Sequence, residues 1–262
     1  MNCNSPKVNL VTGGAGFLGS NLIDKLMKNN QKVICLDNFQ TGKKSNINRW
    51  LDYPNFQYIE HDVTKYIAID VDKIWHLACP ASPAKYQVNP IKTSKTCFIG
   101  TYNMLELAKK NNAKILLASS SEVYGNPQIT PQPEKYTGCV NTTGVRSCYE
   151  EGKRISETLF SDYKRVHNLQ ISIIRIFNTF GPKMSPDDGR VISNFIVQSL
   201  QGKNLTIYGT GNQTRSFCYV DDLIDGMIKV MEGNYSQPIN IGSPVELTIL
   251  EIANKIRNLI NP

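Results

Sequence analysis

Short, continuous runs of apolar residues alternate with helix-length stretches along the first two thirds of the chain. Uninterrupted apolar runs are typical of strands in a parallel sheet covered on both faces, because neither side of such a strand meets water. The predicted strands cover residues 7–12, 32–37, 56–62, 73–78, 114–119 and 170–178. The predicted helices between them lie near 17–30, 90–111 and 144–167. This repetition of strand and helix predicts an α/β fold built on a doubly wound parallel sheet.

The alternation loosens after about residue 180. A loop, "GPKMSPDDGR", is followed by predicted helices near 189–201, from about 220 and from 247. Short strands are predicted at "LTIY", "SFCYV" and "PINIG". These pieces are too few for a second full core. We therefore expect residues 1–180 to form the main domain, and 181–262 to form a small substrate-binding lobe over the carboxyl edge of the sheet.

The composition is that of a globular protein, with 40% hydrophobic and 19% charged residues. No apolar run reaches 18 residues, which predicts that no segment spans a membrane. The N-terminal stretch "MNCNSPKVNLVTGG" leads directly into a strand pattern, so we expect no signal peptide.

The cysteines and the net charge bear on the location of the protein and on the kind of partner it binds. Seven cysteines are scattered without a C-x-x-C pair, which favours reduced thiols and a cytoplasmic location over disulfides or a metal site. The net charge of +7 is spread along the chain, which argues against nucleic-acid binding. A mildly basic protein suits an acidic small-molecule substrate.

A glycine-rich turn, "GGAGFLG", follows the first predicted strand and opens the first predicted helix. It places Gly13, Gly16 and Gly19 at the spacing that a dinucleotide site needs for a tight turn, for close approach of the backbone to pyrophosphate, and for close helix–strand packing. The second strand ends in Asp37, where a carboxylate binds the adenosine ribose and repels a 2′-phosphate. No arginine stands beside it, so the sequence predicts a Rossmann-type domain that binds NAD rather than NADP.

A tyrosine and a lysine lie four residues apart in "SCYEEGK". Tyr149 and Lys153 would share one helix face, about thirty residues after the strand-end serines 119–121. Lowering a phenol pKa from about 10 to about 7 takes roughly 4 kcal/mol, and an ammonium about 4 Å away supplies about that much at an effective dielectric near 20. The sequence therefore predicts that Tyr149 exchanges protons with a substrate.

These motifs together resemble the extended short-chain dehydrogenase/reductases, which bind NAD and act on nucleotide sugars. Longer stretches are similar to one branch, the UDP-glucuronate decarboxylases: "HLACPASPAKYQVNPIKT", "LLASSSEVYGNP", "YEEGKRISETL" and "RIFNTFGPKMSPDDGRVISNFI". The likeness runs from Lys7 to about Ile260. It implies a homodimer that pairs through the helices near 90–111 and 144–167.

The resemblance also implies a reaction and its residues. Tyr149 would take the C4 hydroxyl proton of UDP-glucuronate, Ser120 would bind the C4 oxygen, and Glu122 would lie near C5. The 4-keto acid then loses carbon dioxide, and hydride returns to give UDP-xylose. The implied cofactor contacts are Gly13, Gly16, Phe17, Leu18, Gly19, Asp37, Asn38, Thr41, Asp62, Val63, Leu77, Thr96, Ala118, Tyr149 and Lys153. The implied substrate contacts are Pro80, Ala81, Ser82, Lys95, Asn178, Arg190, Tyr208 and Arg215.

Related chemistries remain open at this stage. A nucleotide-sugar 4,6-dehydratase would carry an Asp-Glu pair where this chain has Ser121 and Glu122, and a 4-epimerase usually has no glutamate there. A third alternative is a nucleotide-binding protein with little catalytic activity. The chain has Cys79 where the family has serine, and family members continue past the position of Pro262 with a further arginine. We expect this 262-residue form to bind NAD well and to decarboxylate UDP-glucuronate slowly or not at all.

Overall fold

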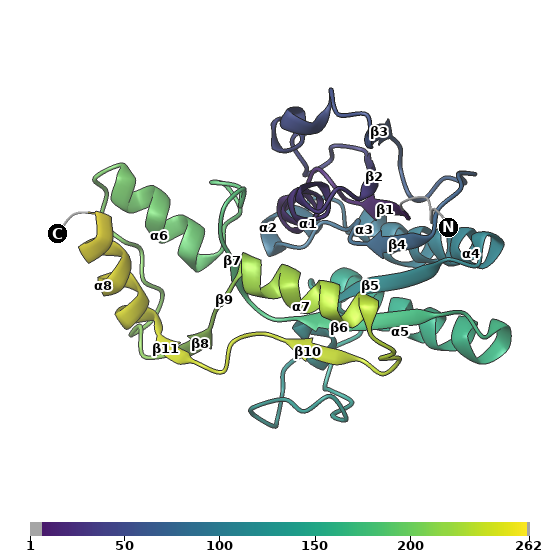
Figure 1. Ribbon diagram of the computed structural model, residues 1–262. Coiled ribbons are helices and arrows are strands. Elements are labelled where there is room, and N and C mark those ends of the chain that lie inside the picture. The colour runs from purple at the N-terminus through teal and green to yellow at the C-terminus, as the bar shows by residue number, and fades with distance from the viewer. Residues whose placement is uncertain (1–6, 261–262) are drawn as a thin grey trace.

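The computed structural model describes residues 7–260 and confirms the predicted α/β class (Figure 1). Its main feature is a parallel sheet of seven strands in the order β10-β6-β5-β4-β1-β2-β3. These strands are β1 Val8–Thr12, β2 Lys32–Asp37, β3 Phe56–Glu60, β4 Lys73–His76, β5 Lys114–Ser120, β6 Ile171–Ile176 and β10 Ile239–Ile241. The order of the strands reverses between β1 and β4, because β2 and β3 lie on one side of β1 and β4 lies on the other. In open parallel sheets, ligands bind beyond the carboxyl ends of the strands at such a reversal.

Helices cover both faces of the sheet. The helices are α1 Phe17–Lys28, α2 Pro83–Tyr86, α3 Pro90–Lys95, α4 Thr101–Asn111, α5 Ser147–His167, α6 Val191–Leu200, α7 Val220–Glu232 and α8 Ile249–Ile260. Helices α1 and α7 cover one face and α4 and α5 the other, whereas α6 and α8 pack together away from the sheet. Short helical turns occupy Lys44–Asn46, Asn48–Trp50 and Ser121–Tyr124, and a π-helical turn at Thr96–Gly100 joins α3 to α4. The predicted helix near 90–111 is therefore one nearly continuous helical segment.

Successive strand residues enter different cores, which explains the unbroken apolar runs. In β5, Leu116 packs into the core under α1 and α7. Its neighbours Ile115 and Leu117 pack into the core under α4 and α5. Both sides of each central strand are therefore apolar, as a sheet buried on both faces requires.

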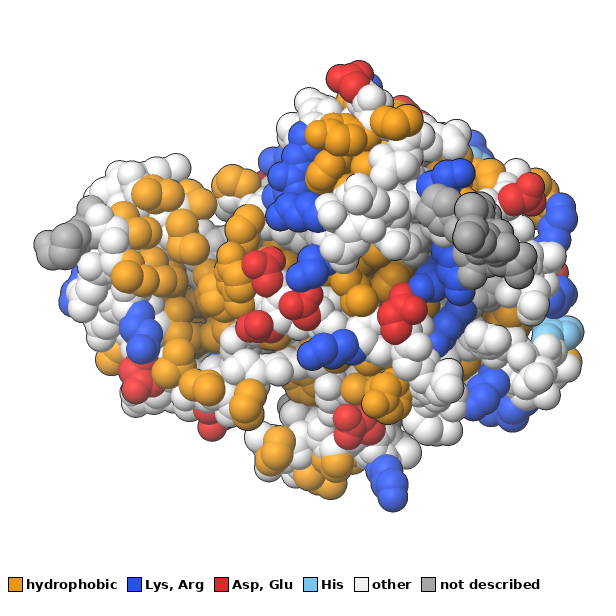
Figure 2. Space-filling model, in the orientation of Figure 1, with side chains coloured by type: hydrophobic (Ala, Val, Ile, Leu, Met, Phe, Trp, Pro, Cys, Tyr) orange, Lys and Arg blue, Asp and Glu red, His pale blue; other side chains and the backbone are white. Residues whose placement is uncertain are grey.

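A third apolar cluster lies in a small lobe formed by α6 and α8 (Figure 1). There β8 (Thr214–Ser216) pairs antiparallel with β11 (Glu246–Thr248). Nearby, β7 (Thr179–Phe180) pairs in parallel with β9 (Cys218–Tyr219). Figure 2 shows hydrophobic side chains gathered over this lobe on one face of the molecule.

The prediction of a strand at "LTIY" is wrong. Residues 203–208 have no regular structure, although Leu205 and Ile207 pack against the core between α6 and α8. Gln198 accepts a hydrogen bond from the backbone N–H of Thr206. A side chain satisfies this backbone group, so the two apolar residues are partly buried without strand pairing.

Two elements beyond residue 180 belong to the main sheet layer. Strand β10 pairs with β6, with Ile239 opposite Ile174, and α7 packs against the sheet beside α1. The boundary at residue 180 itself stays a prediction. Within residues 7–260, no helix is long and apolar enough to cross a bilayer.

Candidate active site

A cavity of about 590 Å³ opens at the carboxyl edge of the sheet, at the reversal between β1 and β4. The turn after β1 and the carboxyl ends of β2, β4, β5 and β6 line it, together with the start of α5. Most of the predicted site residues line this one cavity: Gly13, Gly16, Phe17, Leu18, Gly19, Asp37, Asn38, Thr41, Val63, Leu77, Pro80, Ala81, Ser82, Thr96, Ala118, Ser120, Glu122, Tyr149, Lys153, Asn178 and Arg190.

Four predicted site residues do not line the cavity. Asp62 lies one contact away, where it accepts a hydrogen bond from the amide of Asn38 at 3.1 Å. Lys95 is exposed on α3. Tyr208 and Arg215 are exposed on the chain around the small lobe. The roles proposed for these four residues stay predictions.

The glycine turn has the shape that a dinucleotide needs. Gly13 adopts a positive φ of 68°, and a Cβ on Gly19 would lie 2.2 Å from the carbonyl oxygen of Gly13. Only glycine at position 19 therefore lets α1 begin this close to the end of β1. A phosphate group can then approach the backbone N–H groups of the turn.

Asp37 ends β2 beside this turn. Its carboxylate accepts hydrogen bonds from the backbone N–H groups of Ala15 at 2.9 Å and Phe39 at 2.7 Å. Burial raises the pKa of Asp37, and these N–H donors oppose the rise. Each oxygen keeps a second lone pair for a ribose hydroxyl. The turn and this carboxylate fit NAD.

Tyr149 lies buried at the start of α5, facing the cavity. Its ring stacks on Tyr86, with ring centroids 4.9 Å apart and planes 3° from parallel. The ammonium of Lys153 donates to the carbonyl oxygen of Ala118 at 2.8 Å and lies 5.8 Å from the centre of the Tyr149 ring. The structure therefore brings the predicted tyrosine and lysine to the end of β5.

The surroundings of Tyr149 act on its acidity in both directions. Burial raises the pKa of the Tyr149 phenol well above its ordinary value, and the thiol of Cys79 adds to this effect. A hydrogen bond with Ser120 and the charge of Arg190 lower the pKa. In the protein alone burial dominates, so Lys153 by itself does not produce the acidic phenol that the sequence predicted.

Arg146 and Tyr86, which the sequence did not predict as site residues, also line this cavity. Arg146 forms ion pairs with Glu122 and Glu150, and its Nε donates to the hydroxyl of Tyr86 at 3.2 Å. Arg146 thereby ties the predicted catalytic glutamate to the ring that stacks on Tyr149. The available signal was position, because Arg146 precedes Tyr149 by three residues, about one helical turn.

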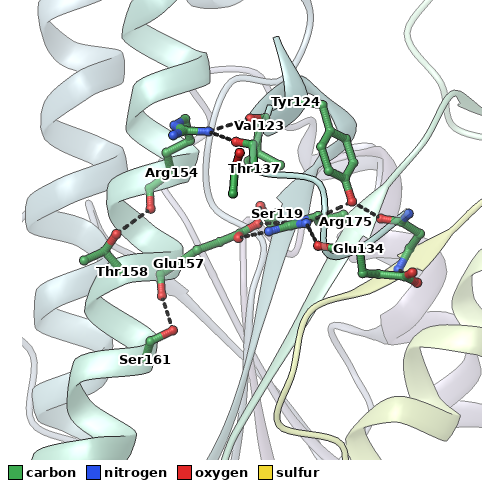
Figure 3. Close-up of polar contacts among 11 residues, drawn as sticks. Ser119, Val123, Tyr124, Glu134, Thr137, Arg154, Glu157, Thr158, Ser161 and Arg175 are labelled. Carbon is green, nitrogen blue, oxygen red and sulfur yellow. Dashed lines mark hydrogen bonds and ion pairs between the residues drawn. The ribbon is translucent and has the colours of Figure 1, made fainter. Parts of the chain in front are cut away.

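A buried polar network holds the end of β5 against α5 (Figure 3). Glu157 accepts a hydrogen bond from Ser119 at 2.6 Å and a bidentate pair from Arg175 of β6, at 3.0 and 2.7 Å. Arg175 also donates to the hydroxyl of Tyr124 and to the backbone oxygen of Glu134, both at 2.9 Å. The network fixes the strand end that carries the predicted active-site serine, Ser120, relative to the helix that carries the predicted catalytic pair.

Comparison with known proteins agrees with this geometry. The NAD dependent epimerase/dehydratase family matches residues 9–242. The UDP-glucuronic acid decarboxylase 3 of Arabidopsis thaliana is 59% identical over 97% of this chain and 74% of its own length. The chain belongs to the NAD-dependent epimerase/dehydratase family, in its UDP-glucuronic acid decarboxylase branch. The UDP-glucuronic acid decarboxylase 1 of Danio rerio is 54% identical over 96% of the chain and 60% of its own length.

Solved structures of other family members share the fold. A UDP-N-acetylglucosamine 4-epimerase from Methanobrevibacter ruminantium, in complex with UDP-N-acetylmuramic acid, superposes with a TM-score of 0.91 at 29% identity. It covers 98% of this chain and 83% of its own. A dTDP-glucose 4,6-dehydratase from Bacillus anthracis, in complex with NAD, has a TM-score of 0.83 at 26% identity, with 97% and 81% covered. The family shares the sheet and the cofactor, so the side chains at the cavity must account for the reaction.

Proposed function

We propose that this chain converts UDP-glucuronate into UDP-xylose and carbon dioxide, using NAD that is regenerated within each turnover. The observation that carries this proposal is the set of groups around one cavity: a dinucleotide turn, a buried Tyr149 with Lys153 and Ser120, and the carboxylate of Glu122 just after β5. The sequence similarity to UDP-glucuronic acid decarboxylases supports the choice of substrate.

The side chains of the cavity would move the protons. When bound, oxidised NAD supplies a hydride acceptor for C4 and a positive charge beside Tyr149. The phenol oxygen of Tyr149 takes the C4 hydroxyl proton, and the hydroxyl of Ser120 holds the C4 oxygen in place. The sugar carboxylate is then β to a ketone, so it leaves as carbon dioxide while the ketone delocalises the electron pair as an enolate. A water would then protonate C5. As hydride returns to C4, Tyr149 would give its proton back to the C4 oxygen, which completes UDP-xylose.

The remaining polar groups would bind the substrate. Asn178 and Arg190 line the cavity, and a guanidinium suits a diphosphate because its fork can bind two oxygens at once. The turn at residues 80–82 lines the same cavity. Glu122, which is paired with Arg146, would orient the sugar ring or a water next to C5. A dehydratase needs an acid beside that glutamate, and this chain has Ser121 there.

Incubation of the purified protein with NAD and UDP-glucuronate labelled with ¹³C at C6 tests the proposal. We expect labelled carbon dioxide and UDP-xylose in equal amounts, and no gas from UDP-glucose, which lacks the carboxylate. Inversion at C4 without gas release would instead assign a 4-epimerase, and elimination of water from UDP-glucose a dehydratase. Binding of NAD and UDP-glucuronate without any product would leave a nucleotide-sugar-binding protein.

We also propose that two copies of the chain associate through α4, α5 and the π-helical turn. Phe98 and Tyr102, one helical turn apart, are 48% and 46% exposed, and Ile155 on α5 is 37% exposed. Large apolar side chains on the outer side of adjacent helices favour burial against a partner.

The six described cysteines are free thiols, which supports the proposal that the protein works in a reducing compartment such as the cytoplasm. Cys3 lies outside the described residues.

A further inference from the structure

Two cysteine thiols lie in contact beside the proposed catalytic residues. The sulfur atoms of Cys79 and Cys97 are 3.4 Å apart, close enough for a thiol hydrogen bond. Neither thiol takes part in the proposed reaction. The two residues are 18 positions apart in the sequence, and the fold brings them together where the loop after β4 meets the π-helical turn before α4.

Cys97 is held in place by α5. Its backbone oxygen accepts a hydrogen bond from the hydroxyl of Ser156 at 3.0 Å. Its sulfur occupies the space left by Gly152, where an added Cβ would lie only 2.8 Å from the sulfur. Gly152 directly precedes Lys153, so Cys97 packs on the helical turn between the proposed catalytic tyrosine and lysine. This sulfur has little room to move.

Cys79 lies on the more adjustable side of the pair. It belongs to a loop between β4 and α2 without regular structure, is partly exposed, and lines the cavity. A small solute that enters the cavity can therefore approach this residue. Pro80, Ala81 and Ser82 of the proposed substrate turn follow directly.

The surroundings favour the thiolate form at one member of the pair, Cys97. The hydrogen bond from Cys79 and the positive charge of Lys153 lower the pKa of Cys97, although burial opposes them. The same contact and burial raise the pKa of Cys79. The thiolate is the reactive form of cysteine, and an adjacent cation stabilises it.

We propose that Cys79 and Cys97 form a reversible disulfide that switches the cavity off when the protein meets a peroxide. A thiolate of the pair attacks one oxygen of hydrogen peroxide, the O–O bond breaks, and the attacking sulfur becomes a sulfenic acid. The hydroxide that leaves takes up a proton and becomes the first water. The second thiolate attacks that sulfur, and the S–O bond breaks with release of water. Two thiols lose two electrons in all, and one peroxide becomes two waters.

The disulfide changes the shape of the cavity. A disulfide bond is about 2.05 Å long, so the two sulfurs must approach by roughly 1.3 Å. Because α5 holds Cys97, the loop of Cys79 makes most of this movement and takes the turn at residues 80–82 with it. The same loop carries Leu77, a predicted cofactor contact two residues before Cys79, so NAD binding is disturbed as well. A displacement of about 1 Å at an active site can lower a rate by about 100-fold. The effect on turnover rests on the proposed function, whereas disulfide formation does not.

The test oxidises the reduced 262-residue chain with one to five equivalents of hydrogen peroxide and then blocks the remaining thiols. Mass spectrometry should show a loss of two hydrogens and a linked peptide pair that contains residues 79 and 97. UDP-xylose formation should fall at least tenfold, NAD affinity by about tenfold, and dithiothreitol should restore both. Calorimetry of NAD binding without the sugar gives a readout that does not depend on decarboxylation.

Three variants separate this pair from the other thiols. Cys97→Ser and Cys79→Ser should form no such link and should keep their rate in peroxide. Cys139→Ser removes an exposed cysteine and should respond like the unchanged protein. The proposal is overturned if peroxide gives a different linkage or only sulfinic acid, or if the linked protein keeps its NAD affinity. If the unoxidised protein makes no UDP-xylose while the link and the loss of NAD affinity appear, the proposed function fails and the switch stands.

Discussion

At the scale of single residues, the phenol of Tyr149 shows why a motif is not yet a mechanism. Burial against Tyr86 raises its pKa, whereas Ser120 and Arg190 lower it. In the protein alone the phenol therefore keeps its proton through neutral pH. The proposed proton transfer needs the further positive charge that oxidised NAD brings when it binds.

The first prediction concerns that phenol. Tyr149→Phe removes the proton acceptor and leaves the stacked ring, so UDP-xylose formation should fall by about 100- to 10,000-fold. NAD affinity, measured by calorimetry, should stay within about twofold. Tyr66→Phe, at a tyrosine that is 68% exposed, is the matched control and should leave the rate unchanged. A Tyr149→Phe variant that kept more than about a tenth of the rate would contradict the acid–base role.

The second prediction concerns His76, which is fully buried between two threonines. Its ring nitrogens lie 2.9 Å from the hydroxyl of Thr12 and 3.2 Å from that of Thr101. Burial first, and repulsion by Lys153 second, lower its pKa to about 3. An unfolded histidine titrates near pH 6.5, so the unfolded chain binds one more proton than the folded chain between about pH 6.5 and 3.

The stability that His76 contributes is therefore present above pH 6.5 and is lost as the pH falls toward 3. Its contribution to the free energy of unfolding should fall by about 1.4 kcal/mol per pH unit in that window. Urea unfolding between pH 4.5 and 7 measures the slope, and His76→Gln should lack this component. Parallel slopes for the two proteins would mean that the histidine is charged in the folded state.

At the scale of elements, α5 organises the site through one face. Tyr149, Lys153 and Glu157 are spaced four residues apart, so they follow one another along the helix toward β5 and β6. Glu157 and Arg175 form an ion pair with both side chains only 12% exposed. Figure 3 shows how this pair joins the helix, two strands and the loop before α5.

The third prediction tests that ion pair. Arg175→Ala leaves a buried carboxylate unpaired, and the free energy of unfolding should fall by about 3–5 kcal/mol. The double change Arg175→Met with Glu157→Leu should cost less than Arg175→Ala, because no charge is then left buried. Arg165→Ala breaks an exposed pair with Asp162 on the same helix and should cost less than about 1 kcal/mol. Similar losses for Arg175→Ala and Arg165→Ala in urea unfolding would refute a special role for the buried pair.

The sequence predicted the strands well where burial on both faces of the sheet leaves a continuous apolar run. Leu116 and its neighbours are apolar on both faces, so the strand pattern around them was unmistakable. The same pattern failed at Leu205 and Ile207, because a loop can bury apolar side chains when a side chain such as Gln198 satisfies its backbone. Apolar character reports burial and does not report pairing.

Site residues were predicted where a motif fixes the backbone, as at Gly19 and Tyr149. Arg146 and Tyr86 were not predicted as site residues, because they matter through a contact between segments that are far apart in the sequence. No local sequence pattern encodes such a contact. The contact between Cys79 and Cys97 escaped for the same reason. Sequence reasoning finds the elements that carry a site more readily than the contacts between them.

At the scale of the whole molecule, the two helical layers differ in the large apolar side chains that they leave exposed. The side with α1 and α7 buries its apolar residues in one continuous core. The α4/α5 side also forms a core with the sheet, yet keeps Phe98 and Tyr102 on its outer surface. This difference between the two layers is the basis of the proposed dimer.

The fourth prediction concerns that association. Phe98→Lys places a charge in the proposed interface, so the protein should sediment as a monomer at concentrations where the unchanged protein is a dimer. Leu259→Lys, at a residue that is 84% exposed on the small lobe, is the matched control and should not change the sedimentation coefficient. An unchanged protein that sediments as a monomer at all concentrations would disprove the dimer.

Strand β10 is the last of the seven sheet strands to be synthesised, and this has a consequence for folding on the ribosome. A ribosome releases the first six strands of the sheet once residue 176 has emerged, but β10 begins only at Ile239. Through the intervening stretch of translation, β6 is an open edge with unpaired backbone groups, and such edges pair readily with strands of other chains. The nascent protein is therefore most exposed to aggregation at that stage, when six of its seven main strands are already available to fold.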